Sequence, residues 1–473
     1  MSSSDANNTK INVIPVVETM PADLLTPLSV YLKLSENSKN SFLLESVEGG
    51  KTLARYSFIG ADPESVLDAG SEDTFEHLKH HFAELQAVSD ADLPAFIGGA
   101  IGYLGFDCSE WFEPSLRREN AVAKDAAFMF FRSTVAFDHA KQVIKIISLV
   151  FTDEAADEEA LQNLYDAATE RNRAIKERLE HGELNIPENA VGTPNSEVSS
   201  NWKREDFESA VTEIKELISA GEAYQVVLSQ CFMKQTNASP VAIYRAIGSI
   251  NPSPYMFLLQ FENKAIVGAS PEMLVRCEND RLEYRPIAGT RPRGKTTAED
   301  EALAEEMRLD KKEVAEHLML VDLGRNDLGR VAEYGSVQVD TLMSVEKYSH
   351  VQHLVSSLSA KLRAGFDRFD ALAVCFPAGT VSGAPKVRAI EIIRKLEPTP
   401  RGVYAGAVGY FDYAGNMDTC IAIRTLVLEN GVAQIQAGAG IVADSVPALE
   451  FEETVNKAKV LLKAIEIAET GSV

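Results

Sequence analysis

The chain has 473 residues, of which 45% are hydrophobic and 25% charged, so its composition is that of a globular protein and excludes a disordered one. Its 46 basic and 70 acidic residues give a net charge of −24, which argues against nucleic acids and anionic membranes as partners. The chain has no run of about 18 apolar residues and its N-terminus lacks the pattern of a signal peptide. We therefore expect a cytoplasmic protein.

The N-terminal part of the chain has mainly the pattern of strands. Residues 141–150 alternate between polar and apolar side chains and predict a strand, and Gly98, Gly99 and Gly102 predict turns. Residues 152–201 begin with an acidic helical run and end in a polar stretch with prolines, which predicts a helix and a linker. We accordingly expect an N-terminal regulatory region, 1–190, and a C-terminal catalytic region, 191–473.

After this linker the apolar residues alternate between helical and strand periods. Apolar side chains recur at helical spacing over residues 207–218, and residues 224–231 predict a strand. Three further strands and a helix from about residue 446 are predicted near the C-terminus, the strands covering 403–411, 419–428 and 432–441. Strands beside separate helices favour an α+β fold with mainly antiparallel sheets.

Five cysteines are scattered along the chain, at Cys108, Cys231, Cys277, Cys375 and Cys420. None has a spacing typical of metal ligands, so we expect reduced, buried thiols and neither disulfides nor a zinc site.

Two predicted helices each carry two glutamates at i,i+3 spacing, which are Glu313 with Glu316 and Glu450 with Glu453. Asp310 is a candidate N-cap of the first helix, and Ser445 with Pro447 opens the second. The spacing places both carboxylates of a pair on one helix face. If the two faces meet, the carboxylates repel one another unless a cation binds, and all-oxygen ligation favours Mg²⁺. The same spacing is also common on solvated helix faces.

Three glycine-rich segments combine glycine with hydroxyl or backbone N–H donors, namely Gly289-Thr290, residues 379–386 ending in Lys386, and Gly438-Ala439-Gly440. Arg424 lies inside the predicted strand 419–428, where its guanidinium needs an anionic partner or a solvent-facing side. Tyr404, on the preceding strand, either shares that partner or packs against the sheet. A substrate that carries a carboxylate satisfies these features.

Two further residues are candidates for proton transfer. Glu272 follows a predicted strand and a proline turn, and nearby carboxylates should raise its pKa and suit it to general acid catalysis. His353 is a candidate donor to a substrate oxygen, although a lone histidine commonly has a structural role.

Several motifs, in this order, resemble the chorismate-utilising enzymes, with residues 286–294 (Pro-Ile-Ala-Gly-Thr-Arg-Pro-Arg-Gly), 316–322, 325–330, 382–386 and 438–440. The match spans residues 203–465. The resemblance implies an α+β fold in which two largely antiparallel sheets form a sandwich with helices packed outside.

Two positions favour the anthranilate-forming members of that family. Ala288 stands where aminodeoxychorismate-forming members typically carry a lysine, and Gln225 stands where water-adding members carry a lysine base. The resemblance thus implies a lyase that converts chorismate and ammonia into anthranilate and pyruvate, the first committed step of tryptophan biosynthesis. Aminodeoxychorismate formation, or a non-catalytic regulator that binds an amino acid, are the alternatives.

The resemblance also implies a role for each site residue. Glu316 and Glu453 would bind Mg²⁺ directly, and Glu313 and Glu450 would hold its waters. Glu272 would be the general acid, with His353, Thr380 and Gln225 beside the reacting groups. The substrate would be held by Gly289, Thr290, Tyr404, Arg424, Gly438, Ala439 and Gly440, and Lys386 is a further candidate.

Two segments resemble the tryptophan feedback pocket of the family. They contribute Leu44, Glu45 and Ser46, and Pro254, Tyr255 and Met256. No cysteine lies in the glycine-rich turn that a glutaminase nucleophile requires. We therefore expect the chain to use free ammonia and to recruit a separate glutamine amidotransferase subunit, in a heterotetramer of two chains of each kind.

Overall fold

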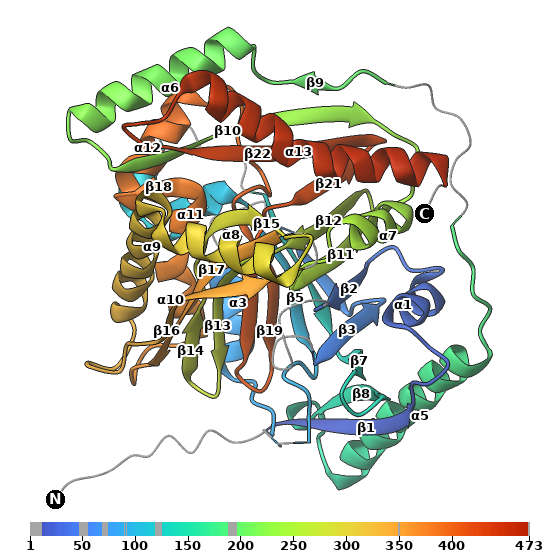
Figure 1. The fold of residues 1–473 in the computed structure, drawn as a ribbon. Coiled ribbons are helices and arrows are strands. Elements are labelled where there is room, and N and C mark those ends of the chain that lie inside the picture. Colours follow the sequence, from blue (N-terminus) through green and yellow to red (C-terminus); the bar gives the residue numbers. More distant parts are fainter. Residues whose placement is uncertain are drawn as a thin grey trace, which may run out of the picture.

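A computed structural model describes residues 12–46, 55–68, 74–88, 90, 92–118, 125–187, 196–348 and 351–471. Two sheets face each other in this structure, and helices cover their outer surfaces (Figure 1). The named strands of the described residues pair antiparallel throughout. The expected α+β sandwich is therefore confirmed.

The larger sheet has twelve described strands. Their spatial order is β1 (Val13–Pro21), β8 (Val143–Phe151), β7 (Ser133–Asp138), β3 (Tyr56–Ala61), β2 (Ser41–Glu45), β11 (Tyr255–Phe261), β12 (Lys264–Ser270), β21 (Thr425–Glu429), β22 (Val432–Ile441), β10 (Gln225–Gln235) and β18 (Gly383–Ala384), with β9 (Ser199–Ser200) paired to β10.

The smaller sheet has ten described strands. Their order is β15 (Ile287–Pro292), β17 (Val351–Lys361), β14 (Arg281–Tyr284), β13 (Met273–Glu278), β20 (Met417–Ile421), β19 (Ala407–Asp412), β5 (Gly99–Leu104), β6 (Ala126–Phe131) and β4 (Ser65–Asp68), with β16 (Gln338–Lys347) paired to β17.

Helices of the described residues pack around the two sheets (Figure 1). They are α1 (Pro27–Ser35), α3 (Thr74–Ala83), α4 (Ser109–Phe112), α5 (Glu158–His181), α6 (Arg204–Ser219), α7 (Pro240–Ile250), α8 (Thr297–Leu309), α9 (Lys311–Gly329), α10 (Arg368–Cys375), α11 (Gly379–Ser382), α12 (Lys386–Leu396) and α13 (Pro447–Thr470). None of these helices is apolar enough over a sufficient length to cross a membrane.

The N-terminal and C-terminal regions share both sheets. In the larger sheet β2 pairs with β11, and in the smaller sheet β5 pairs with β19. The predicted boundary between residues 190 and 191 lies outside the described residues and stays a prediction. Because strands of both regions hydrogen-bond side by side, we expect the two regions to unfold together.

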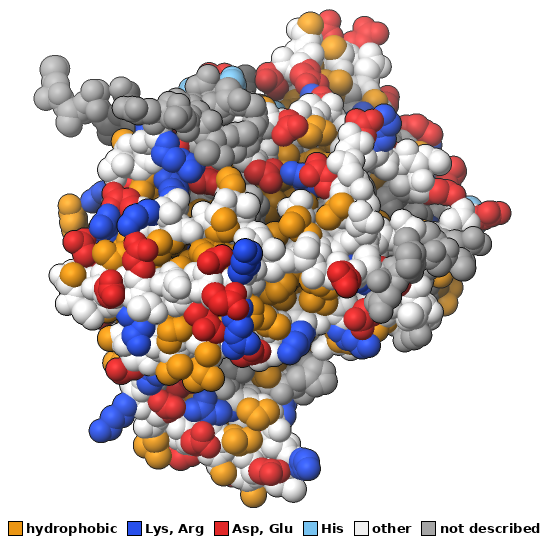
Figure 2. All heavy atoms as spheres, turned by 90° about the horizontal axis from the view of Figure 1, so that it is seen from above, with side chains coloured by type: hydrophobic (Ala, Val, Ile, Leu, Met, Phe, Trp, Pro, Cys, Tyr) orange, Lys and Arg blue, Asp and Glu red, His pale blue; other side chains and the backbone are white. Residues whose placement is uncertain are grey.

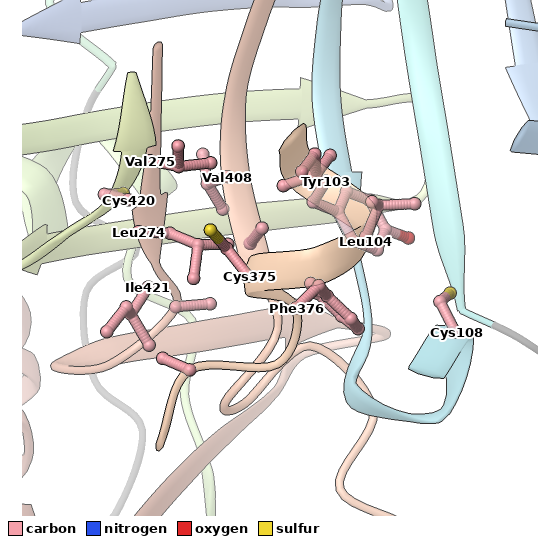
Figure 3. Close-up of a cluster of buried hydrophobic side chains, with 14 of the residues drawn as sticks. Tyr103, Leu104, Cys108, Leu274, Val275, Cys375, Phe376, Val408, Cys420 and Ile421 are labelled. Atoms are coloured by element: carbon pink, nitrogen blue, oxygen red, sulfur yellow. The ribbon is translucent and has the colours of Figure 1, made fainter. Parts of the chain in front are cut away.

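Apolar side chains are buried on both faces of the larger sheet. On β2, Phe42 belongs to the core between the sheets, whereas its neighbour Leu43 belongs to the core under α1 and α7. The smaller sheet adds a cluster in which Leu274, Val408 and Cys375 gather from β13, β19 and α10 (Figure 3). Strands buried on both faces have nearly continuous apolar sequences, as β6 does with Ala126–Phe131.

The five cysteines are free thiols, as expected, and four of them are fully buried. On the face that Figure 2 shows, acidic and basic side chains are interspersed, so the excess negative charge does not form one patch there.

Three predictions of local structure were wrong. The predicted strand 419–428 is two strands, because the chain passes from β20 in the smaller sheet to β21 in the larger sheet, with Arg424 at a φ of 51° between them. Tyr404 lies in the turn before β19, not on a strand. Gly102 lies inside β5, where a Cβ would come 1.9 Å from the carbonyl oxygen of Ala127. Close approach of two strands, not a turn, therefore requires this glycine.

Helix α9 begins as predicted and α13 begins differently. The Asp310 side chain accepts from the backbone N–H groups of Lys312 and Glu313. The N-cap of α13 is Val446, whereas the Ser445 hydroxyl accepts from the backbone N–H of Val442 at 3.0 Å. Pro447 occupies the first turn, where its missing N–H costs nothing.

Candidate active site

A cavity of about 220 Å³ lies where β10 and β22 of the larger sheet approach β15 and β17 of the smaller sheet. Twelve of the predicted catalytic, substrate and metal residues line it, namely Gln225, Glu272, Gly289, Thr290, Glu316, His353, Thr380, Tyr404, Arg424, Gly438, Gly440 and Glu453. They come from segments more than 200 residues apart in the chain. This convergence makes the cavity the candidate active site.

Glu272 lies in the turn between β12 and β13 and is 3% exposed. Burial raises the pKa of its carboxyl to about 8, although hydrogen bonds from Thr380 and the backbone of Ile287 lower it. The Thr380 hydroxyl donates to Glu272 Oε1 at 2.8 Å. The predicted rise in pKa is thus confirmed, but its cause is burial and not the proximity of other carboxylates. At neutral pH this carboxyl is protonated and can give a proton to a leaving group.

His353 on β17 lies beside the glycine turn of β15. Its Nδ1 is 2.8 Å from the carbonyl oxygen of Gly289 and 3.1 Å from Thr290 Oγ1. Since a carbonyl only accepts, Nδ1 carries the proton, and burial lowers the pKa of the ring so that it is neutral. In that tautomer Nε2 is an acceptor, so the expected role of His353 as a donor requires a protonated ring.

Arg424 and Tyr404 form a second wall. Within the described part of the chain Arg424 makes no ion pair, and burial lowers the pKa of its guanidinium. Burial also raises the pKa of Tyr404 to about 12, so its hydroxyl stays protonated. An unpaired guanidinium beside a phenol in a cavity indicates an anionic ligand, because an isolated charge away from bulk water needs compensation.

Glycines make room for neighbouring side chains at two places in this cavity. A Cβ on Gly440 would come 3.1 Å from Gln225 Nε2, and a Cβ on Gly438 would come 2.7 Å from the Tyr404 hydroxyl. Gly289 has a φ of 65°, which favours glycine.

Glu316 on α9 and Glu453 on α13 line the same cavity, so the two predicted carboxylate faces meet. Burial raises the pKa of Glu316, and the charges of Glu313 and Glu453 raise it further. Among the described residues, no group of three acidic, histidine or cysteine side chains lies close enough together to hold a metal ion. Two carboxylates completed by water and substrate oxygens nevertheless fit Mg²⁺, which keeps several waters in protein sites.

Glu313 and Glu450 lie behind this pair. Arg291 donates to Glu313 Oε1 at 3.0 Å, and Glu450 is 7% exposed with its carboxyl bonded to Ser445. Neither lines the cavity. Their expected role in holding the waters of a metal stays a prediction.

Two predicted substrate residues do not line the cavity. Lys386 donates to Asp327 Oδ2 at 2.9 Å and to the carbonyl oxygens of Val374 and Cys375 at 3.1 and 3.2 Å. Its ammonium therefore binds the C-terminal end of α10 and is not free for a ligand. Ala439 does not line the cavity and is fully buried in the core.

Lys457 lines the cavity and was not predicted. Its ammonium is 2.6 Å from Glu453 and donates to the carbonyl oxygen of Gly438 at 2.9 Å. It thereby connects a candidate metal ligand to a candidate substrate strand. The i,i+4 spacing from Glu453 on one helix was the available signal.

A second cavity of about 490 Å³ lies between the sheets and is lined by residues of β2, β3 and β11 from the larger sheet and of β13, β19 and β20 from the smaller one. All six residues predicted for an effector pocket line it, which are Leu44, Glu45, Ser46, Pro254, Tyr255 and Met256. Pairing of β2 with β11 places Glu45 opposite Met256 and brings the two segments together. The Tyr255 hydroxyl donates to Asp418 at 3.0 Å, and Arg276 and Arg55 add positive charge to the lining.

The fold and the cavity define a class of protein. The family described as chorismate binding enzyme matches residues 39–463, and the chain belongs to this family. It is 45% identical to anthranilate synthase component 1 of Acetivibrio thermocellus, over 97% of this chain and 96% of that one.

Solved structures agree with this assignment. The structure of anthranilate synthase component I from Streptococcus pneumoniae matches with a TM-score of 0.75 and 35% identity, over 94% of this chain and 99% of that one. The menaquinone-specific isochorismate synthase of Escherichia coli has the same fold at 21% identity, with a TM-score of 0.73 over 97% and 96%. Since enzymes with different reactions share the fold, the residues of the cavity must decide the reaction.

Proposed function

We propose that this chain is the aminating subunit of an anthranilate synthase, a cytoplasmic lyase that converts chorismate and ammonia into anthranilate and pyruvate. The observation that carries the proposal is a buried Glu272, protonated at neutral pH, in one cavity with an unpaired Arg424 and the Glu316 and Glu453 carboxylates. Chorismate has two carboxylates and a hydroxyl that must leave, and this cavity has a group for each.

Each part of the substrate has a partner in the cavity. Arg424 and Tyr404 hold the enolpyruvyl carboxylate through the guanidinium and the phenol. Glu316 and Glu453 would hold Mg²⁺, with Glu313 and Glu450 beside its waters, and a bound metal would supply the positive charge that neutralises the ring carboxylate next to the attacked carbon. Backbone groups at Gly289 and Gly438 complete the site, as a carboxylate accepts from N–H donors.

Hydroxide is a poor leaving group, so the C4 hydroxyl of chorismate must be protonated as it leaves, and Glu272 supplies this proton. Ammonia forms a bond to ring C2 while the bond from C4 to its hydroxyl breaks, and the proton of Glu272 makes the departing group water. Thr380 holds this carboxyl at 2.8 Å. Loss of the C2 proton and of the enolpyruvyl group as pyruvate then makes the ring aromatic.

Gln225 favours ammonia over water as the nucleophile. It is 3% exposed, lines the cavity and stands where water-adding relatives carry a lysine. A neutral amide cannot take a proton from water, whereas ammonia attacks as the free base and needs no activation.

A product assay tests the proposal directly. The purified chain with chorismate, Mg²⁺ and an ammonium salt should release anthranilate and pyruvate in equal amounts, which fluorescence and mass spectrometry measure. EDTA should abolish the signal. With glutamine in place of ammonium the isolated chain should give no product until an amidotransferase subunit is added, since none of the five cysteines has a catalytic context. Aminodeoxychorismate as the product would contradict the proposal.

The partner follows from the same argument. We propose a heterotetramer of two such chains and two glutamine amidotransferase subunits, in which the partner supplies ammonia from glutamine. The component 1 name of the relatives supports a second component.

The cavity between the sheets supports feedback inhibition by L-tryptophan. Ser46 and the backbone near Pro254 face the ammonium and carboxylate of an amino acid, while Met256 and Tyr255 offer apolar surface to an indole. Because β12 and β21 lie between β11 and the active-site strand β22 in the larger sheet, an effector in this separate cavity acts by favouring one arrangement of the sheets.

Replacing Ser46 with alanine is expected to raise the tryptophan concentration for half-maximal inhibition about tenfold or more, since a hydrogen bond to a charged group is lost. The uninhibited rate should change little. Ser41→Ala is the matched control, because Ser41 begins β2, the strand that ends one residue before Ser46, but bonds Tyr31 at 3.0 Å and lies outside the cavity. Titrating the initial rate with tryptophan measures both. Equal losses of rate and inhibition would contradict a separate effector site.

A further inference from the structure

A buried ion pair lies directly behind the active-site cavity. Arg401 and Glu397 follow α12, with side chains 1% and 4% exposed, and neither lines the cavity itself. Nε and Nη2 of Arg401 donate to the two oxygens of Glu397 at 2.9 and 2.6 Å. This bidentate geometry fixes the plane of the guanidinium.

The other donors of Arg401 bind two walls of the cavity. Nη1 donates to the carbonyl oxygen of Val381 at 2.7 Å, and Nη2 donates to that of Val227 at 2.7 Å. Its Cζ also lies 5.6 Å from the centroid of the Tyr404 ring. Val381, Val227 and Tyr404 all line the cavity. One guanidinium therefore connects α11, β10 and the turn before β19.

Glu397 extends the connection to a fourth wall. Its Oε1 accepts from the backbone N–H and from the hydroxyl of Ser229, each at 2.8 Å. The same hydroxyl accepts from Gln436 Nε2 at 2.8 Å, and Gln436 lines the cavity from β22. The pair thus contacts, directly or through one side chain, four segments that surround the substrate.

We propose that Arg401, held by Glu397, is a positioning residue for the amination reaction, an inference that rests on the proposed function. It fixes the turn of Val381, so that the neighbouring Thr380 holds the general acid Glu272, and it fixes Tyr404 against the substrate carboxylate. Stability alone does not require a charge pair here, because apolar residues of similar size often stabilise a core as well or better. The planar guanidinium of arginine can donate to all three partners at once, which are the Glu397 carboxylate and the carbonyl oxygens of Val381 and Val227.

Arg401→Lys keeps the positive charge but removes the planar set of N–H donors. The variant therefore tests whether Arg401 acts through its hydrogen bonds and not through its charge alone. We expect kcat for anthranilate formation to fall at least about tenfold, as misplaced catalytic groups typically cost this much or more. The high-pH limb of the rate profile should also move upward, because the Thr380 bond that lowers the pKa of Glu272 is weakened. A purely structural role would not move this limb.

Arg394→Lys is the matched control, since Arg394 lies in the last turn of α12, the helix that precedes Arg401. Arg394 is also largely buried, with a side chain 11% exposed, and it is paired with Asp107 at 3.3 Å and Glu110 at 3.4 Å and donates to the carbonyl oxygen of Leu116 at 2.9 Å. None of these partners lines the active-site cavity. This variant should lose a similar amount of thermal stability and keep its kcat.

Equal kcat in the two lysine variants, or an unmoved pH limb, would overturn the inference. If Arg401→Lys does not fold, Ser229→Ala tests the same connection. It should lower kcat about fivefold, the equivalent of one hydrogen bond, and full activity would overturn the inference. Absence of anthranilate with the unaltered chain would instead refute the proposed function, so the two failures are distinguishable.

Discussion

Replacing Glu272 with glutamine is expected to lower kcat for anthranilate formation by about 10²–10⁴-fold, the range that general acid catalysis contributes. Glutamine fills the same buried space and still meets the Thr380 hydroxyl, but it has no proton to give to the leaving hydroxyl. Steady-state rates at saturating chorismate, Mg²⁺ and ammonium measure the effect. A loss smaller than about tenfold would mean that water or another residue protonates the leaving group.

The pH dependence gives an independent test of the same residue. The proton of Glu272 is present below a pKa of about 8 and is lost as pH rises through it. The rate per concentration of uncharged ammonia should therefore fall above about pH 8, and Glu272→Gln should lack this limb. Thr380→Val removes a bond that lowers the pKa and orients the carboxyl, so it should move the limb upward and also lower kcat by about fivefold, the equivalent of one hydrogen bond.

Folding stability should follow the same titration. The folded pKa of Glu272 lies above its ordinary value of 4.5, so its contribution to stability is fully present below about pH 4.5 and declines as pH rises through about 8. Glu272→Gln removes this decline. The melting temperature of the variant should therefore gain on that of the unaltered chain between about pH 4.5 and about pH 8. Parallel melting curves across that range would contradict the assigned pKa.

How much of the site could be predicted depended on whether a signal was local. The i,i+3 glutamates of α9 and α13 were predicted because one helix presents both side chains of a pair on one face. Residue spacing alone does not show that the two helices bring these pairs into one cavity. That prediction rested on the family resemblance. The break at Arg424 was missed because apolar residues continue from β20 into β21 across two different sheets.

Two lysines show the same limit of local sequence signals, one as a wrong prediction and one as a residue that was missed. Lys386 was predicted to bind substrate because it ends a glycine-rich segment that opens a helix, but its ammonium binds the end of α10. Lys457 lies in an ordinary helical sequence, yet it enters the cavity beside Glu453. In both cases the direction of a long side chain decided the outcome, and packing across the fold, not the local sequence, sets that direction.

Replacing Glu316 with glutamine is expected to raise the Mg²⁺ concentration for half-maximal rate at least about 100-fold, since even residues that only support metal ligands change affinity 10–100-fold. Glu313→Gln is the control one turn earlier on α9. Because Glu313 bonds Arg291 and lies outside the cavity, its loss should weaken Mg²⁺ binding less. Equal effects of the two variants would contradict a direct ligand at Glu316.

Glu316→Gln, which weakens Mg²⁺ binding, should not weaken the fold when no metal is present. The charges of Glu313 and Glu453 raise the pKa of Glu316, so without metal these carboxylates repel one another. In EDTA Glu316→Gln should therefore melt at the same temperature as the unaltered chain or higher. Added Mg²⁺ should raise the melting temperature of the unaltered chain, which binds it only when folded, and should leave the variant almost unchanged. A variant that melts lower in EDTA would show that Glu316 stabilises the fold itself, and the two glutamate faces would then have to be explained without a metal.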